Sequence, residues 1–83
     1  MYATIRKILS AVGYLPVDVA TLTDDQDLYA AGLTSFSVVQ VMLSLEEAFN
    51  LEFPNRMLNR RTFSSIAAIA ACIGEIAPNK AAA

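Results

Sequence analysis

Apolar residues recur at helical spacing in three stretches of the chain, and each stretch predicts an amphipathic helix. The first stretch places them at i, i+3, i+4 and i+7, namely Ile5, Ile8, Leu9 and Val12. Gly13 and Pro16 are expected to end this helix, because glycine lacks helix propensity and proline removes a backbone donor.

The second and third helices are expected after residue 33. Thr34 has a hydroxyl that can cap a helix running to about Phe49. Residues 51–54 are expected to be extended, since the residue before Pro54 is disfavoured in the helical region. Residues 55–59 are expected to form one short turn or helix. Thr62 is expected to cap a last helix, which ends at Pro78. That helix carries one apolar face, formed by Ile66, Ile69, Ile73 and Ile76.

A long connection over residues 17–33 separates the first two helices, with Val19, Leu22 and Leu28 as apolar anchors to the core. Connections of this length inside a compact domain are usually functional. The sequence therefore predicts an all-α fold, a small four-helix bundle with three main helices, a short third helix and a long loop between helices 1 and 2. We expect a single domain over residues 1–78 and a disordered C-terminal tail over 79–83.

Composition and charge narrow the class of protein. The 83 residues are 55% hydrophobic and 17% charged, which favours a small folded domain without a deep catalytic cavity. The net charge of −2 gives no general attraction to nucleic acid or to an anionic membrane. The apolar run over residues 66–73 is too short to span a bilayer, and no secretion signal is visible. We expect a cytoplasmic monomer.

The inventory of reactive side chains is small. The chain has no histidine and a single cysteine, Cys72, which lies in an apolar setting typical of an inert, buried thiol. No cluster of residues has the spacing of a metal site. An enzyme is therefore disfavoured, and so is a helix-turn-helix DNA-binding protein, because the best helix ends in Glu46 and Glu47 rather than in basic residues.

The second helix has more apolar surface than one buried face requires. One stripe, expected in the core, consists of Val38, Val41 or Met42, Leu45 and Phe49. Phe36, Val39 and Leu43 form a second stripe, and Ser37, Gln40, Ser44 and Glu47 are the polar remainder. A small bundle could bury both stripes. We favour the alternative that the second stripe is partly exposed and contacts partner proteins.

Ser35 lies just after a glycine-bearing turn, at the opening of the second helix, within residues 27–36. The N–H groups and the positive dipole end of a helix stabilise a phosphate at such a position. Gly32 is expected to take a positive φ in the turn. On local sequence alone, the favoured interpretation is that Ser35 merely caps the helix, with Thr34 helping or replacing it.

Residues 27–36 resemble the attachment site of the acyl carrier and peptidyl carrier proteins, in which a serine bears a phosphopantetheine arm. The resemblance continues through residues 35–54, with the Leu-Glu-Glu-x-Phe ending over 45–49, and more weakly to the helices at Ile5 and Ile66. It implies a covalent 4′-phosphopantetheine on Ser35, flanked by Thr34 and Gly32. It also implies that the arm holds an activated acyl or aminoacyl group as a thioester and that the protein itself catalyses nothing.

The resemblance implies partners as well: a phosphopantetheinyl transferase, an adenylating acyl or aminoacyl ligase, and a downstream acyltransferase or synthase. Carrier proteins use this part of helix two for docking, which gives Phe36, Val39 and Leu43 that expected role. Arg56, Arg60 and Arg61 form a local basic cluster. It is either a solvated surface or a docking point for an acidic partner.

The chain departs from the carrier pattern in several places. Thr34 stands where carriers have aspartate or histidine, Phe36 where they have leucine, and Ser37 and Gln40 where fatty-acid carriers have acids. These departures favour a discrete, specialised carrier that is loaded by a dedicated adenylating ligase, including ligases for amino acids. A carrier for fatty-acid or polyketide-type synthesis is the nearest alternative. A small helical interaction module that bears no prosthetic group is the alternative from another class.

Overall fold

A computed structural model of the chain describes residues 1–77, which fold into three α-helices and three short 3-10 helices, with no β-strand among them. The α-helices are α1 (Tyr2–Val12), α2 (Ser35–Phe49) and α3 (Ile66–Ile76), and the 3-10 helices are η1 (Val19–Thr21), η2 (Asn55–Met57) and η3 (Arg60–Phe63). The all-α prediction is confirmed. The expected tail over 79–83 and the expected stop at Pro78 lie outside the described residues.

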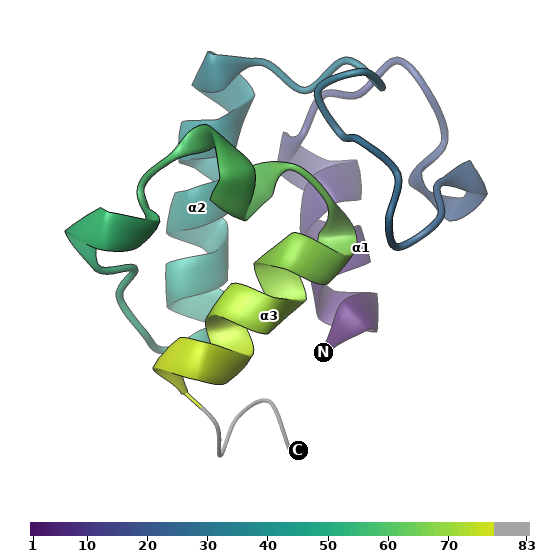
Figure 1. Ribbon diagram of the computed structural model, residues 1–83. Coiled ribbons are helices and arrows are strands. Elements are labelled where there is room, and N and C mark those ends of the chain that lie inside the picture. The colour runs from purple at the N-terminus through teal and green to yellow at the C-terminus, as the bar shows by residue number, and fades with distance from the viewer. Residues whose placement is uncertain (78–83) are drawn as a thin grey trace.

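The three α-helices enclose one core, with α1 packed against both α2 and α3 (Figure 1). Each helix buries the apolar face that its spacing predicts, and the loops add further members. The buried apolar residues are Ile5, Leu9, Val19, Leu22, Leu28, Leu33, Val41, Leu45, Phe53, Met57, Phe63, Ile66, Ile69, Ala70 and Ile73. The predicted core residues Val38, Met42 and Phe49 of α2 are partly buried and pack against this cluster, as does Cys72. Within residues 1–77, none of the helices has the length and apolar character that crossing a membrane requires.

The long connection between α1 and α2 follows the core closely. The predicted anchors Val19, Leu22 and Leu28 are all buried, and Leu33 is a further anchor that the spacing did not indicate. Its one helical element is η1, where the Asp18 carboxylate accepts a hydrogen bond from the Ala20 N–H at 2.9 Å. Buried side chains thus fix the path of a segment that has little secondary structure.

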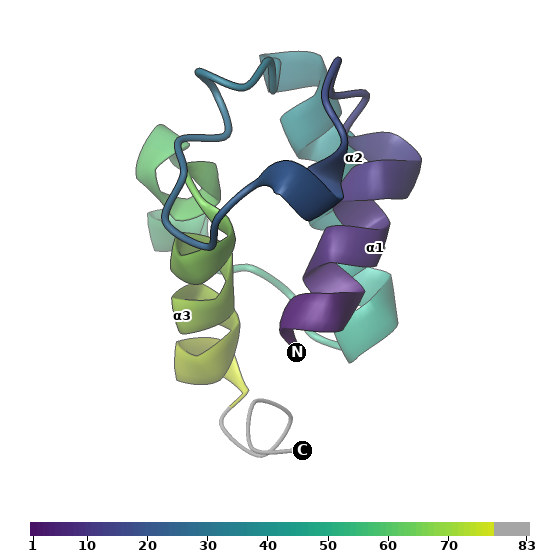
Figure 2. The ribbon, with the colours of Figure 1, turned by 90° about the vertical axis from the view of Figure 1, so that its right-hand side faces the viewer.

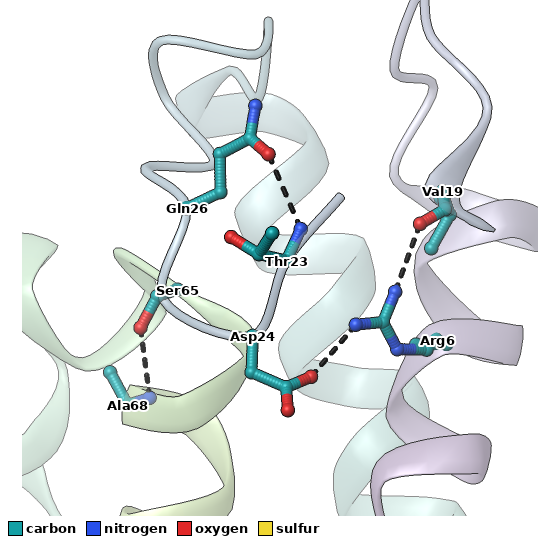
Figure 3. A network of polar contacts seen from close by, with 7 residues as sticks. All are labelled: Arg6, Val19, Thr23, Asp24, Gln26, Ser65 and Ala68. Carbon is teal, nitrogen blue, oxygen red and sulfur yellow. Dashed lines mark hydrogen bonds and ion pairs between the residues drawn. The ribbon is translucent and has the colours of Figure 1, made fainter. Parts of the chain in front are cut away.

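The same connection passes between α1 and α3 (Figure 2), and polar contacts attach it to both helices. The guanidinium of Arg6 on α1 donates to the Val19 carbonyl at 3.0 Å and forms an ion pair with Asp24 at 2.7 Å (Figure 3). The Asp24 carbonyl in turn accepts a hydrogen bond from the Ala67 N–H of α3 at 2.8 Å. Asp24 therefore links both helices through the loop, which limits how far the loop can move from the core.

The prediction that Thr62 caps the last helix is wrong. The Ser65 hydroxyl caps α3 by accepting a hydrogen bond from the Ala68 N–H at 3.0 Å (Figure 3). Thr62 lies inside η3 and is buried, and its N–H donates to the Asn59 side chain at 3.1 Å. Ser and Asn are at least as good as Thr at the cap position, so residue type alone did not identify the cap. The short turn or helix expected over residues 55–59 is present as the 3-10 helix η2, and η3 follows it as a second 3-10 helix.

Two leucines on α2 provide a direct test of this core. Leu45 is 0% exposed and Leu43 is 52% exposed, although both belong to the same helix. Leu45→Ala is expected to lower the free energy of unfolding by about 2–5 kcal/mol, because it removes buried methyl groups and leaves a cavity. Leu43→Ala, as the matched control, is expected to cost less than about 1 kcal/mol. Urea unfolding measures both, and equal losses would contradict the assignment of these two faces.

Candidate functional site

The segment before α2 is folded back on itself and tied to the rest of the domain. The Asp27 carboxylate accepts hydrogen bonds from the N–H groups of Tyr29 and Ala30, at 2.9 and 3.4 Å. The N–H of Leu28 donates to the Ser64 carbonyl at 2.8 Å, and the N–H of Leu33 donates to the Leu28 carbonyl at 2.9 Å. With both leucine side chains buried, this short loop delivers the chain to the start of α2 in a fixed position.

Gly32 takes a backbone conformation that other residues rarely adopt, with φ at +118°. The expected positive φ is therefore confirmed. The structure adds a second constraint, because a Cβ at this position would lie 2.6 Å from Cδ of Pro16. Gly32 thus lets the turn before the helix pack directly against the loop that leaves α1.

Thr34, and not Ser35, caps α2. The Thr34 hydroxyl oxygen accepts a hydrogen bond from the Ser37 N–H at 3.1 Å, and its O–H donates to the Ser37 hydroxyl oxygen at the same distance. Ser35 is the first residue of α2 and is exposed, and its hydroxyl forms no hydrogen bond within residues 1–77. The reading of Ser35 as a cap is therefore wrong. Ser37, expected among the polar surface positions, is instead 3% exposed.

An open groove with a volume of about 380 Å³ is lined by Ser35 and lies between α2 and the segment of η2 and η3. Its apolar walls come mostly from α2 and from Phe63, while Tyr29, Asn59 and Arg60 add polar groups. The lining residues are Tyr29, Ser35, Val38, Val39, Met42, Leu58, Asn59, Arg60 and Phe63. Neither Tyr29 nor Asn59 was predicted as a site residue, because nothing in the local sequence pattern brings them close to Ser35.

Tyr29 and Arg60 form a stacked pair in this groove. The Arg60 guanidinium lies 3.9 Å from the centroid of the Tyr29 ring, and the Tyr29 hydroxyl donates to the Arg60 carbonyl at 3.0 Å. Burial raises the pKa of Tyr29, against the opposing effect of the Arg60 charge and with a contribution from Asp27. The hydroxyl therefore stays protonated at neutral pH and keeps its role as a donor.

The second apolar stripe of α2 is exposed, as we favoured. Phe36 is 70% exposed, Val39 46% and Leu43 52%. Val39 also lines the groove, so the stripe and the groove meet beside Ser35. Leu58, at 47% exposure, adds apolar surface on the opposite wall. A partner that covers the stripe would therefore also reach the mouth of the groove.

The three arginines are exposed on η2 and η3, but they have different surroundings. Arg56 forms an ion pair with Glu75 of α3 at 3.0 Å, while Arg60 stacks on Tyr29 and lines the groove. Arg61 is exposed, and its carbonyl accepts a hydrogen bond from the Ser64 hydroxyl at 2.7 Å. The structure thus places one of the three, Arg60, in the same groove as Ser35.

The model of the family described as "phosphopantetheine attachment site" matches residues 3–73 of this chain. The chain belongs to this family. It is a carrier protein rather than an enzyme, and its prosthetic group is a covalently attached 4′-phosphopantetheine.

Several known proteins are similar in sequence to this carrier protein over nearly its whole length. The chain is 54% identical to an aminoacyl carrier protein of Agrobacterium fabrum over 83 residues, which is 100% of both chains. It is 56% identical to a chain in the crystal structure of an engineered Bradyrhizobium japonicum glycine:carrier protein ligase with a carrier protein from Agrobacterium tumefaciens and AMP. That match has a TM-score of 0.86 and covers 88% of this chain and 97% of the other.

Two further solved structures agree with this match. The corresponding complex with ATP gives 55% identity and a TM-score of 0.88, over 90% of this chain and 97% of the other. A solution structure from Agrobacterium tumefaciens gives 54% identity and a TM-score of 0.76, over 100% of both chains. The arrangement of helices in this carrier protein is therefore that of proteins solved by two different methods.

The close approach of Gly32 to Pro16 can be tested by substitution. Gly32→Ala is expected to lower the free energy of unfolding by more than about 1 kcal/mol, because a side chain at this φ is strained and also meets Pro16. Pro16→Ala in the same chain is expected to recover only part of the loss, since it removes the steric contact but not the strain. Thermal or urea unfolding of the two variants measures this, and a neutral Gly32→Ala would contradict the geometry.

Proposed function

We propose that Ser35 bears the phosphopantetheine arm and that an adenylating aminoacyl ligase loads the carrier protein. The observation that carries the proposal is the division of roles at the start of α2. Thr34 satisfies the helix end, which leaves the exposed hydroxyl of Ser35 available for a phosphodiester bond. Ser37, the nearest competing serine, is buried and accepts a hydrogen bond from Thr34.

The surroundings of Ser35 fit the prosthetic group. The first-turn N–H groups of α2 and its dipole favour a negative phosphate at this position. The groove offers the remainder of the arm an apolar wall with a few polar groups along it. When bound, the arm supplies a terminal thiol on which an acyl or aminoacyl group is held as a thioester. The chain's own residues contribute attachment, position and recognition: Ser35 is the point of attachment, and Gly32 and Thr34 fix where it emerges.

The choice of an aminoacyl ligase as the loading enzyme rests on the relatives and on the surface of α2. Similar proteins include an aminoacyl carrier protein and a chain crystallised with a glycine:carrier protein ligase. The exposed stripe of Phe36, Val39 and Leu43 lies next to the arm, so a ligase that covers it would hold the thiol near its own active site. A phosphopantetheinyl transferase, a downstream acyltransferase or synthase, and a cytoplasmic location complete the proposal.

Mass spectrometry after incubation with coenzyme A and a broad-specificity phosphopantetheinyl transferase tests the attachment. The wild-type chain and Ser37→Ala are expected to gain the mass of one phosphopantetheine, and Ser35→Ala to gain nothing. The two substitutions remove the same hydroxyl group from positions two residues apart, so Ser37→Ala is a matched control. Circular dichroism is expected to show Ser35→Ala fully folded, because the Ser35 hydroxyl forms no hydrogen bond within residues 1–77.

Two results would contradict the attachment. A mass gain in Ser35→Ala would place the arm on another residue. An unmodified wild-type chain with several transferases would favour the interaction module, in which the apolar stripe of α2 binds a partner and no arm is present.

Transfer of glycine from a glycine:carrier protein ligase to the arm-bearing protein tests the docking stripe. Leu43→Asp is expected to lower kcat/KM for the carrier by about tenfold or more, because it places a charge in an apolar contact. Val17→Asp is the control, since Val17 is also a partly exposed apolar residue (42%) but lies in the loop after α1. Equal effects of the two substitutions would exclude a specific role for the stripe.

A further inference from the structure

Arg60 is a cation in the groove, and its charge has no anionic partner among residues 1–77. Within residues 1–77, the ion pairs involve other arginines: Arg6 pairs with Asp24, and Arg56 pairs with Glu75. The contact that holds the Arg60 side chain is its stack on Tyr29, at 3.9 Å from the ring centroid. Within residues 1–77 the Arg60 guanidinium donates no hydrogen bond, so its N–H groups stay available to an acceptor while its carbon lies over the ring.

The contact with the Tyr29 ring also restricts where the guanidinium can lie. Tyr29 is held by two contacts that do not involve the guanidinium: its N–H donates to Asp27 at 2.9 Å, and its hydroxyl donates to the Arg60 carbonyl at 3.0 Å. The residues joined by the hydroxyl contact are 31 positions apart in the chain. The nearby acid, Asp27, accepts the N–H groups of Tyr29 and Ala30 at its Oδ1 and forms no ion pair with Arg60 within residues 1–77. A long, flexible arginine side chain is thereby held against one wall of the groove.

Attachment of the arm would bring an anion to this groove. The phosphodiester on the Ser35 oxygen carries one negative charge, and both Ser35 and Arg60 line the groove. Among the lining residues, Arg60 is the one with a charged side chain, and Asn59 and Tyr29 are neutral donors and acceptors. Guanidinium and phosphate groups match in charge and in hydrogen-bond geometry.

We infer that Arg60 binds the phosphodiester of the arm and so directs the arm along the groove, over Val38, Met42 and Phe63. This inference rests on the proposed attachment at Ser35. Without such a contact, the arm would leave Ser35 in any direction open to solvent. With it, the first part of the arm lies against α2, beside the exposed stripe that a partner is proposed to cover. The contact is partly exposed to solvent, so it biases the arm without fixing it.

The decisive measurement compares the arginine side-chain Nε–H signals of the wild-type protein before and after the arm is attached, by NMR. Arg60→Gln and Arg61→Gln, prepared without the arm, identify the two signals by their disappearance. The Arg60 signal is expected to move when the arm is attached and to return toward its original position in 1 M salt, because salt screens an exposed ion pair. The Arg61 signal is expected to stay unchanged. Arg61 is the matched control, since it is the neighbouring exposed arginine of the same 3-10 helix.

The unfolding midpoint gives a second readout that does not depend on any ligase. The increase in midpoint on attachment of the arm is expected to be smaller in Arg60→Gln than in Arg61→Gln by about 1–4 °C, the size expected for one exposed ion pair in a domain of this length. Arg60→Lys is expected to fall between them, because lysine keeps the charge but loses the planar fork.

The outcomes separate this inference from the proposal on which it rests. A mass gain at Ser35 with an unmoved Arg60 signal would overturn the inference and leave the attachment standing. Equal movement of the Arg60 and Arg61 signals would also overturn it, since that result indicates a general field rather than a contact. Absence of the mass gain in the wild-type chain would overturn the attachment first, and the role of Arg60 with it.

Discussion

The anchoring of Leu28 in the core is the constraint on which the site depends. Its side chain is 0% exposed, its N–H donates to Ser64 beside α3, and its carbonyl accepts from Leu33 at the end of the turn. One residue in a long, irregular connection thus fixes the loop to the core, to the start of α3 and to the entry of α2. A loop of this length would otherwise cost conformational entropy without defining where Ser35 emerges. Burial of a single leucine, with two backbone hydrogen bonds, thus fixes the position of Ser35.

Three neighbouring hydroxyl groups at the start of α2 then take three different roles. Thr34 caps the helix, Ser37 is buried beneath the cap, and Ser35 projects into solvent at the first position of the helix. Each helical residue turns about 100° from the one before it, so residues 35 and 37 face in very different directions. Ser35 and Ser37 have the same side chain, so the difference in their accessibility arises from their positions on the helix. This is how a carrier protein can present one serine among several.

Sequence patterns predicted the helices and the turn before α2 because these depend on local signals, whereas Ser35 was singled out by the resemblance to carrier proteins. The apolar spacing of α1 and α3, the two stripes of α2 and the glycine of the turn are all determined within a few residues. Contacts between distant segments could not be predicted in this way. The packing of Pro16 on Gly32 and the stack of Arg60 on Tyr29 depend on how the loop and η3 meet after folding. The prediction of the residue that caps α3 was wrong for a related reason, since several residues before the helix have side chains that can cap it.

The fold does not require the exposed stripe on α2 to be apolar. Phe36, Val39 and Leu43 could be polar without loss to the core, because the opposite face of the helix, with Val41 and Leu45, already supplies the buried contacts. Exposed apolar side chains promote non-specific association, so a small domain gains nothing from them unless they serve binding. Their position is informative, because the stripe begins at the residue after Ser35 and shares Val39 with the groove. One helix thus provides the core on one face and, on the other, an apolar surface that lies beside Ser35.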